Sequence, residues 1–348
     1  MKGVVRARAS VRKGTLGRGR GQPAWRRCSQ PSAREIIEQG STSTFRNSSM
    51  GLVVVGSVAL DTVETPFGKC TDALGGSATY CSVAASHFTS PTLVGVVGED
   101  FSDEHVALLA DHNIDLSGLE RREGRTFRWS GRYGYDLNER ETLSTCLNVF
   151  EDFDPVVPEQ ARGEGYLFLG NIHPEVQLAV LDQMVSPKFV ACDTMNLWIE
   201  TERELLLEVI SRVDAVMVND GEVRQLTGEP NLIMATSELR AMGAKMVVVK
   251  KGEHGCLCDA GGSRFFAPAY PLEFVFDPTG AGDSFAGGFM GYLARTDDLS
   301  EPAVRRAVVY GSVLASFCVE EFGLRRLAHI DEKAIERRYR EFGELTAF

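Results

Sequence analysis

From residue 50 onward, short apolar runs alternate with stretches whose apolar residues recur at helical spacing. The runs predict strands at residues 52–58, 92–97, 166–169, 189–192, 215–218 and 245–249. The stretches between them predict helices at residues 78–87, 103–112, 175–185, 202–212 and 232–242. Strands that are apolar throughout and separated by helices imply a mostly parallel sheet with helices on both faces, so we expect an α/β fold.

Four of these predicted strands are followed by a polar residue, namely Asn171, Asp193, Asn219 or Lys250. Open α/β sheets bind their ligands outside the carboxyl ends of the strands, which meet at one edge. We therefore expect these four side chains to converge on one crevice. Taken singly, each could instead begin a turn or cap a helix.

One region has strand periodicity outside this alternation. Residues 126–136 read TFRWSGRYGYD, with Phe127, Trp129, Tyr133 and Tyr135 at every second or fourth position, which predicts a strand with its rings on one face. A second strand at residues 142–149 is expected to pair with it. Together with residues 61–74, the segment 124–149 would form a small separate β-sheet, which serves either as a lid over the crevice or as a dimer contact.

The charge is distributed unevenly along the 348 residues. Residues 1–49 contain 11 Lys or Arg and only two acidic residues, whereas the rest carries 26 basic and 46 acidic residues, a net charge of −20. The acidic part argues against a nucleic-acid groove, which needs clustered positive charge. The basic part is expected to be disordered. Three interpretations are an organelle transit peptide, a basic arm that binds nucleic acid, and upstream sequence included because the translation start is placed too early. We prefer the third.

The eight cysteines are scattered and show no spacing of a zinc site, which fits free thiols in a reducing cytosol. The apolar runs are far shorter than the roughly 20 residues that cross a bilayer, so we expect a cytoplasmic protein without a membrane partner. No GxxxxGK[ST] sequence occurs, which disfavours a P-loop.

The stretch with the most chemical information is DPTGAGDSFAGGF at residues 277–289. Gly280, Ala281 and Gly282 have little or no side chain, so their backbone N–H groups can approach an anion at the start of a helix. Asp283 beside such a phosphate cradle is suited to accept a proton from a hydroxyl that attacks phosphorus. The alternative is a helix cap with glycines for close packing.

This stretch resembles the second signature of the PfkB carbohydrate kinases, the ribokinase-like family, and the resemblance extends from residue 50 to about residue 327. Gly75 and Gly76 are similar to the early Gly-Gly motif, residues 219–222 to the N-x-x-E motif, and GSVALD at 56–61 to the first strand. The resemblance implies one three-layer kinase domain over residues 50–348, with a small β lid at about 61–74 and 124–149. Lid-mediated homodimers occur in the family.

On the donor side, the resemblance implies Asp283 as catalytic base and the N–H groups of Gly280, Ala281 and Gly282 as anion hole. ATP and Mg²⁺ are the implied cofactors. The nucleotide-binding set is Asn219, Glu222, Lys250, Gly252, Gly255 and Thr279. Of these, Asn219 and Glu222 would act on Mg²⁺ through water. Lys250 stands where the family usually has a hydroxyl, and Asp277, with Thr279, lies where some members bind a monovalent cation. Asp277 could instead orient the loop.

On the acceptor side, the resemblance and the strand ends point to Asp61, Gly75, Gly76, Tyr80 and Asn171 as substrate-binding residues. Asp61 would accept hydrogen bonds from sugar hydroxyls. Ala59, Ser77 and Tyr80 depart from the ribose-kinase pattern. Tyr80 and the aromatic lid strand could stack on a nucleoside base or simply pack against their own protein.

Three functions are compatible with these residues. The leading one is ATP-dependent phosphorylation of a hydroxymethyl group of a small sugar. The second keeps this chemistry with a nucleoside such as adenosine or inosine as acceptor. The third is a non-catalytic protein that senses a metabolite with a kinase fold, against which the presence of Asp283 next to an anion hole argues.

Overall fold

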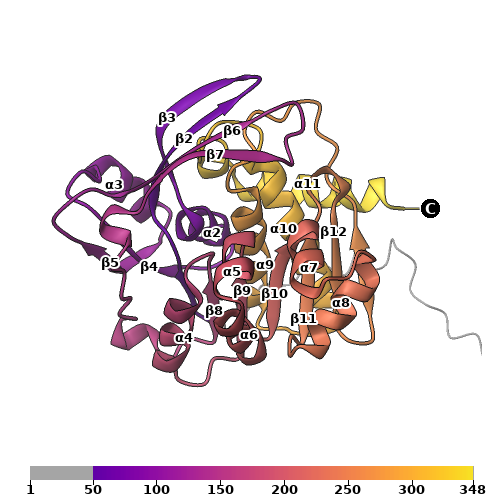
Figure 1. Ribbon diagram of the computed structural model, residues 1–348. Coiled ribbons are helices and arrows are strands. Elements are labelled where there is room, and N and C mark those ends of the chain that lie inside the picture. Colours follow the sequence, from indigo (N-terminus) through magenta and orange to yellow (C-terminus); the bar gives the residue numbers. More distant parts are fainter. Residues whose placement is uncertain (1–49, 348) are drawn as a thin grey trace, which may run out of the picture. The chain divides into compact units, whose positions relative to one another are not determined.

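A computed structural model describes residues 50–347 (Figure 1). The expectation for residues 1–49 lies outside the described residues. Among the helices of the described part, none combines the length and the apolar character that a bilayer crossing demands.

The larger sheet has nine strands in the order β13-β12-β11-β10-β9-β8-β1-β4-β5. Its strands are β1 Leu52–Val55, β4 Pro91–Val97, β5 Asp115–Arg121, β8 Tyr166–Leu169, β9 Phe189–Asp193, β10 Ala215–Asn219, β11 Met246–Lys250, β12 Cys256–Asp259 and β13 Arg264–Ala267. The strands from β11 to β5 pair in parallel, whereas β12 pairs antiparallel with both β11 and β13. The predicted parallel sheet is confirmed.

Helices cover both faces of this sheet (Figure 1). They are α2 Ser77–Ser86, α3 Asp103–Asp111, α4 Pro174–Gln183, α5 Asn196–Thr201, α6 Arg203–Arg212, α7 Asp220–Thr227, α8 Leu232–Ala241, α9 Ala281–Thr296, α10 Glu301–Cys318 and α11 Glu332–Leu345, with short 3₁₀ turns at Asn148–Phe150, Glu159–Ala161, Gly252–His254 and Leu327–His329. Leu52 and Val54 face the apolar core that includes α2, α9, α10 and α11. Val53 and Val55 face a second core with α4, α6, α7 and α8. The result is three layers.

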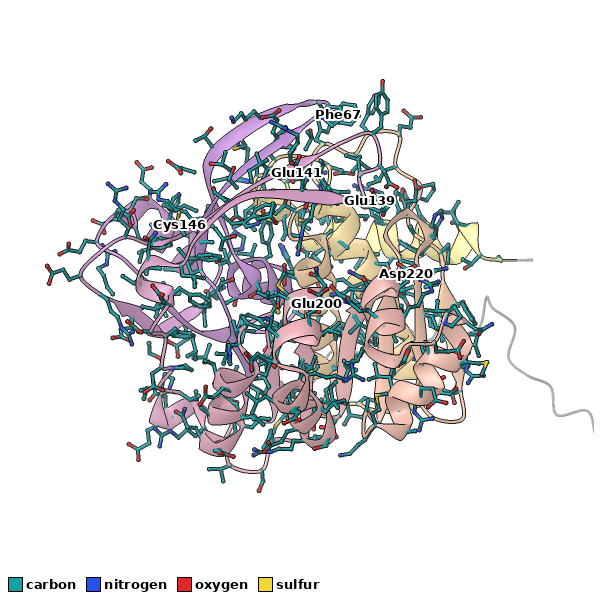
Figure 2. All side chains as sticks on the ribbon, viewed as in Figure 1. Phe67, Glu139, Glu141, Cys146, Glu200 and Asp220 are labelled. Carbon is teal, nitrogen blue, oxygen red and sulfur yellow. The ribbon has the colours of Figure 1, made fainter. Side chains whose placement is uncertain are left out.

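A second, four-stranded sheet stands apart from the larger one (Figure 1). It consists of β2 Ala59–Thr65, β3 Gly68–Gly75, β6 Phe127–Tyr133 and β7 Arg140–Cys146, in the order β3-β2-β6-β7. β6 and β7 pair, as predicted, and their pairing is antiparallel, whereas β2 and β6 are parallel. Figure 2 shows Phe67, Glu141 and Cys146 projecting from this sheet, and every residue of β7 is exposed.

The predicted strand at 52–58 is too long, because the apolar run is divided between β1 of the larger sheet and the approach to β2 of the small sheet. β1 ends at Val55, and the chain then turns at Gly56, where a methyl group would lie 2.5 Å from Ser77 Oγ. Ser57 N–H donates to Ser77 Oγ over 3.1 Å, which fixes the turn against α2. The chain enters the small sheet at Ala59, so the apolar run contains a change of sheet that periodicity does not report.

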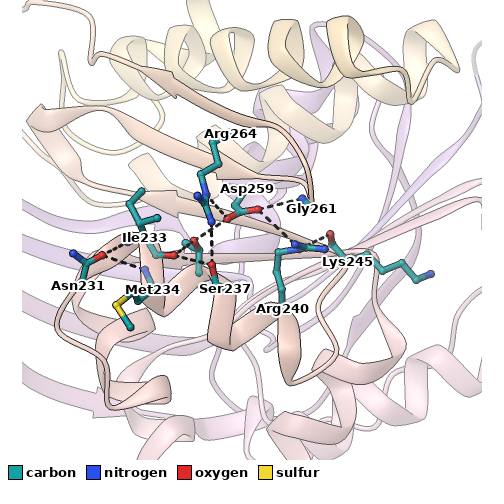
Figure 3. Close-up of polar contacts among 10 residues, drawn as sticks. Asn231, Ile233, Met234, Ser237, Arg240, Lys245, Asp259, Gly261 and Arg264 are labelled. Atoms are coloured by element: carbon teal, nitrogen blue, oxygen red, sulfur yellow. Dashed lines mark hydrogen bonds and ion pairs between the residues drawn. The ribbon is translucent and has the colours of Figure 1, made fainter. Parts of the chain in front are cut away.

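The hairpin of β12 and β13 is fastened to α8 by a buried carboxylate, Asp259 (Figure 3). Arg264 Nε donates to its Oδ2 over 2.8 Å and Thr236 Oγ1 over 3.0 Å, while the N–H of Gly261 donates to Oδ1 over 3.1 Å. A buried carboxylate with this many donors is fully compensated. The network therefore stabilises the edge of the sheet next to β11, whose carboxyl end carries Lys250.

Candidate active site at the carboxyl edge of the sheet

The polar residues that follow the parallel strands do meet at one edge. Lys250 Nζ donates to Asp193 Oδ2 over 2.6 Å, although β10 lies between their two strands. Asn219 is aligned with Lys250 in the register of β10 and β11. The convergence expected from the strand ends is thus present for these three residues.

The glycine-rich stretch begins α9. Gly280 has φ of 76°, and a methyl group there would lie 2.4 Å from the Tyr80 ring, so glycine is required on both grounds. The N–H of Ala281 donates to the carbonyl of Pro278 over 3.2 Å. Within residues 50–347, the N–H groups of Gly280 and Gly282 have no acceptor. The structure therefore leaves two amides, rather than the expected three, for an anion.

Asp283 stands in the first turn of α9, next to these amides. Desolvation and the neighbouring Asp193 raise the pKa of Asp283 to about 7, against the opposing charges of Lys250 and Arg140. A carboxyl group with a pKa near neutrality is well matched to accept a proton at physiological pH. A position in the first turn of a helix stabilises the ionised carboxylate, but desolvation by burial is the largest effect on the pKa of Asp283.

Asp61 approaches the same site from β2 of the small sheet. A methyl group at Gly75 would lie 2.0 Å from Asp61 Oδ2, so the absence of a side chain at Gly75 makes room for the carboxylate. The backbone N–H of Gly76 donates to that carboxylate. Burial, together with the charges of Asp277 and Asp283, raises the pKa of Asp61 to about 7. Gly75 and Gly76 thus position the Asp61 carboxylate within electrostatic reach of Asp283.

Asn219 and Glu222 form a reciprocal cap at the start of α7. Asn219 Oδ1 accepts from the N–H of Glu222, and Glu222 Oε2 accepts from the N–H of Asn219, each over 2.7 Å. Desolvation and the charge of Asp193 raise the pKa of Glu222 to about 7. One carboxylate oxygen of Glu222 and the amide nitrogen of Asn219 remain outside this cap.

Tyr80 has a different place from the one expected. Its side chain is 2% exposed and lies in the apolar core directly beneath Gly280. This burial does not allow the ring to stack on a nucleoside base, and Tyr80 instead supports the glycine loop from below. Tyr80 lies in the first turn of α2, just after the Gly-Gly motif. At this position the sequence does not tell whether a side chain points into the core or toward a ligand.

Gly252 and Gly255 form the turn between β11 and β12. Both have positive φ, of 53° and 79°. A methyl group at Gly252 would meet Asn138 Oδ1, which lies between β6 and β7, and one at Gly255 would meet the carbonyl of Ala267. Neighbouring segments thus approach both positions so closely that a side chain would not fit there. The contact at Gly252 also brings the small sheet against the loop that follows Lys250.

Asp277 and Thr279 tie the glycine loop to its surroundings. Asp277 Oδ1 accepts from the N–H of Thr279 over 2.9 Å, and Oδ2 accepts from the N–H of Gly323 over 3.1 Å. Thr279 Oγ1 donates to the Tyr133 hydroxyl over 3.3 Å. These contacts orient the loop, and the monovalent-cation site at Asp277 stays a prediction.

Asn171, after β8, is held by a residue that no sequence pattern indicated. Trp198 Nε1 donates to Asn171 Oδ1 over 3.0 Å, so the amide nitrogen of Asn171 is turned away from the indole. The preceding Gly170 approaches Ser77, where a methyl group would lie 2.7 Å from Ser77 Oγ. Asn171 therefore lies close to the start of α2 and its Gly-Gly motif.

Sequence reasoning missed two residues of the site. Asp193 was expected at the crevice but was given no role, and Arg140 was not singled out. Arg140 is aligned with Tyr133 in the small sheet, and its charge acts on both Asp283 and Glu222. The only signal for Arg140 was a basic residue next to the predicted strand at 142–149.

Comparisons with known proteins identify the family of this chain. Residues 52–330 match the model of the pfkB family carbohydrate kinases. The chain is similar to the cytidine kinase of Thermococcus kodakarensis, with 33% identity over 261 residues that cover 72% of this chain and 91% of that protein. It is also similar to fructokinase-2 of Zea mays, with 29% identity over 72% of this chain and 80% of that protein.

Among solved structures, the fructokinase of Vibrio cholerae O395, bound to fructose, ADP and calcium ion, superimposes with a TM-score of 0.70. The two proteins share 20% sequence identity over 84% of this chain and all of that one, which shows a common fold. The chain belongs to the pfkB family of carbohydrate kinases. It is accordingly a phosphotransferase with an alcohol group as acceptor.

Proposed function

We propose that this protein transfers the terminal phosphoryl group of ATP to the hydroxymethyl group of a small sugar, with Asp283 as general base. The observation that carries the proposal is that Asp283 lies beside the two unbonded amides of Gly280 and Gly282 and within the electrostatic reach of Asp61. The base and the anion site come from one segment of the chain, residues 280–283, and Asp61, which would accept hydrogen bonds from the sugar, comes from β2. Their convergence is the arrangement that phosphoryl transfer to an alcohol requires.

In the proposed reaction, the acceptor hydroxyl gives its proton to the Asp283 carboxylate while its oxygen forms a bond to the γ-phosphorus. The bond from that phosphorus to the oxygen bridging the β- and γ-phosphates breaks, and ADP leaves with that oxygen. The amides of Gly280 and Gly282 stabilise the negative charge on the transferring group. A base in this position contributes about 10² to 10⁴ in rate.

The family implies Mg²⁺, which neutralises phosphate oxygens when it is bound. Glu222 suits an ion held mainly by water and phosphate, because one of its carboxylate oxygens is left over from the α7 cap, and the free amide N–H₂ of Asn219 can donate to a phosphate oxygen. No group of three His, Cys, Asp or Glu residues within 50–347 is arranged to hold a metal directly. This donor set fits Mg²⁺, which retains much of its water shell.

A nucleoside is the second candidate acceptor, and one observation favours it. Trp129 is aligned with Asp61 in the register of β2 and β6, so both side chains lie on the same face of the small sheet. An aromatic ring next to the residue that binds the sugar is suited to stack on a base. The similarity to a cytidine kinase supports the same interpretation.

The deciding experiment is a panel of free sugars and nucleosides, each incubated with ATP labelled at the γ-phosphate, with label in the acceptor as the measurement. A free sugar that is phosphorylated faster than any nucleoside supports the first candidate, and the reverse order supports the second. If no acceptor is labelled although ligands raise the melting temperature, the protein is a metabolite sensor. Trp129→Ala should weaken the binding of nucleosides and leave that of free sugars unchanged.

A further inference from the structure

The buried ion pair between Lys250 and Asp193 joins two strands that are not neighbours. Lys250 ends β11 and Asp193 ends β9, with β10 between them (Figure 1). Nζ and Oδ2 are 2.6 Å apart, and the two side chains are only 17% and 7% exposed. Because both charges have lost most of their water, their geometry has to be favourable for the pair to persist.

The carboxylate of Asp193 is itself held in place. Its Oδ1 accepts from the N–H of Thr194 over 2.9 Å, which leaves Oδ2 for Lys250. Its backbone carbonyl accepts from Gln177 Nε2 over 3.0 Å, and the same nitrogen donates to the carbonyl of Gly170 over 2.9 Å. Gln177 thus joins the ends of β8 and β9, and Asp193 is a fixed point rather than a mobile counterion.

The ammonium of Lys250 lies against the glycine loop. A methyl group at Gly282 would stand 3.1 Å from Lys250 Nζ, so the glycine leaves room for the ammonium group beside the loop. An ammonium group has three N–H donors. Within residues 50–347, only Asp193 accepts one of them. Two unused donors of Lys250 therefore lie beside Gly282, in the loop whose amides at Gly280 and Gly282 are also unused.

The remaining charges around this point are mostly negative. Asp193, Glu222 and Asp283 act on Lys250, and Arg140 is the other cation whose charge reaches Glu222 and Asp283. A polyphosphate entering such a site meets repulsion unless a cation faces it at short range. Lys250 is the cation that touches the loop.

We infer that Asp193 is a positioning residue that holds the ammonium of Lys250 against the loop 280–282, where it binds the terminal phosphates of the donor nucleotide. The inference rests on the proposed function. Asp193 does not touch the nucleotide in this arrangement and acts only through Lys250. A purely structural ion pair that ties β9 to β11 is the competing explanation.

The test is a double-mutant cycle in nucleotide binding, measured by calorimetry on the full chain. The variants are Asp193→Asn, Lys250→Met and the combination of both. The ligands are the β,γ-imido analogue of ATP, with Mg²⁺, and AMP, which lacks the terminal phosphates. Each single variant should weaken binding of the ATP analogue by about tenfold, as expected for loss of one charged hydrogen bond, and leave AMP binding unchanged. The double variant should bind no more weakly than Lys250→Met.

A second ion pair provides the matched control. Lys245 immediately precedes the same strand, β11, and its Nζ lies 2.7 Å from Asp214 Oδ1, at the opposite end of the strand. Lys245→Met and Asp214→Asn should leave the affinity for the ATP analogue unchanged. Melting temperatures of all variants identify any that fail to fold. Lys250→Arg, which keeps the cation, should retain more affinity than Lys250→Met.

Three results would contradict the inference. If Asp193→Asn weakens AMP and the ATP analogue equally, or weakens neither, Asp193 does not serve the terminal phosphates. If its effect is as large in the Lys250→Met background as in the native protein, it does not act through Lys250. If the native protein still phosphorylates an acceptor, either of these first two results overturns the inference about Asp193 but leaves the proposed function intact. A native protein that neither binds the ATP analogue nor labels any acceptor overturns the proposed function as well.

Discussion

Thr279 Oγ1 donates a hydrogen bond to the Tyr133 hydroxyl over 3.3 Å, and this bond joins residues 146 positions apart in the chain. Thr279 belongs to the loop that leads into α9, and Tyr133 ends β6 of the small sheet. The bond therefore links the small sheet to the loop that carries the anion site and Asp283. We take this link to hold the small sheet closed over the reacting groups, as a lid.

The first prediction concerns that link. Tyr133→Phe keeps the ring and removes the hydroxyl, so it should lower kcat/KM for the acceptor by about fivefold, the effect of losing one neutral hydrogen bond. Steady-state kinetics with the acceptor identified in the panel measure it. Tyr135→Phe is the matched control because the Tyr135 side chain on the same hairpin is fully exposed. Equal effects of both substitutions would contradict the role of the link.

The second prediction concerns Gly280. Gly280→Ala places a methyl group 2.4 Å from the buried Tyr80 ring, on a backbone whose φ of 76° also disfavours alanine. The loop has to shift, so we expect a loss of at least about 1 kcal/mol in the free energy of unfolding and a large loss of turnover. Chemical denaturation and kinetics measure the two effects. At Gly134, where a methyl group meets nothing within 4 Å, the same substitution should change neither.

The third prediction concerns the pH dependence of the reaction. Because Asp283 has to be ionised to accept a proton, and its pKa is raised to about 7, kcat/KM should rise with pH through neutrality and then level off. Arg140 opposes the rise in this pKa. Arg140→Met should therefore move the midpoint of the profile to higher pH. A midpoint below pH 5, or no movement in the variant, would contradict the electrostatic account of the site.

The fourth prediction concerns stability in the absence of ligands. Folding raises the pKa of Asp283 to about 7, so ionisation of this carboxyl group destabilises the folded state. The protonated group therefore contributes to the free energy of unfolding at low pH, and this contribution is lost as the pH rises from about 4 to about 7. Asp283→Asn removes this loss. The melting temperature of the variant, minus that of the native protein, should consequently increase between pH 5 and pH 8. A constant difference across this range would show that Asp283 titrates at its ordinary value.

Much of this arrangement could be predicted from the sequence, because apolar runs and glycine-rich turns have direct structural consequences. The end of β11 at Lys250 and the start of α9 within GAGD both follow from local pattern. The parallel order of the strands then forces Asp193 and Lys250 to the same edge.

Other features depended on contacts that are distant along the chain. Tyr80 is buried because Gly280 packs on its ring, and the two are 200 positions apart. The amide of Ala281 is unavailable because the loop closes on the carbonyl of Pro278, a detail of turn geometry that glycine spacing does not define. Arg140 reaches Asp283 only through the pairing of β7 with β6, and the hydrophobic pattern of a fully exposed strand does not indicate this pairing.

The account depends most on Asp283 as the group that accepts the proton of the acceptor hydroxyl. Single-turnover transfer of labelled phosphate tests this directly, with native protein and Asp283→Asn compared at equal saturation by ATP, Mg²⁺ and acceptor. The account predicts that the variant binds the ATP analogue as the native protein does but transfers phosphate about 10² to 10⁴ times more slowly. Transfer at the native rate by a folded Asp283→Asn protein would contradict it.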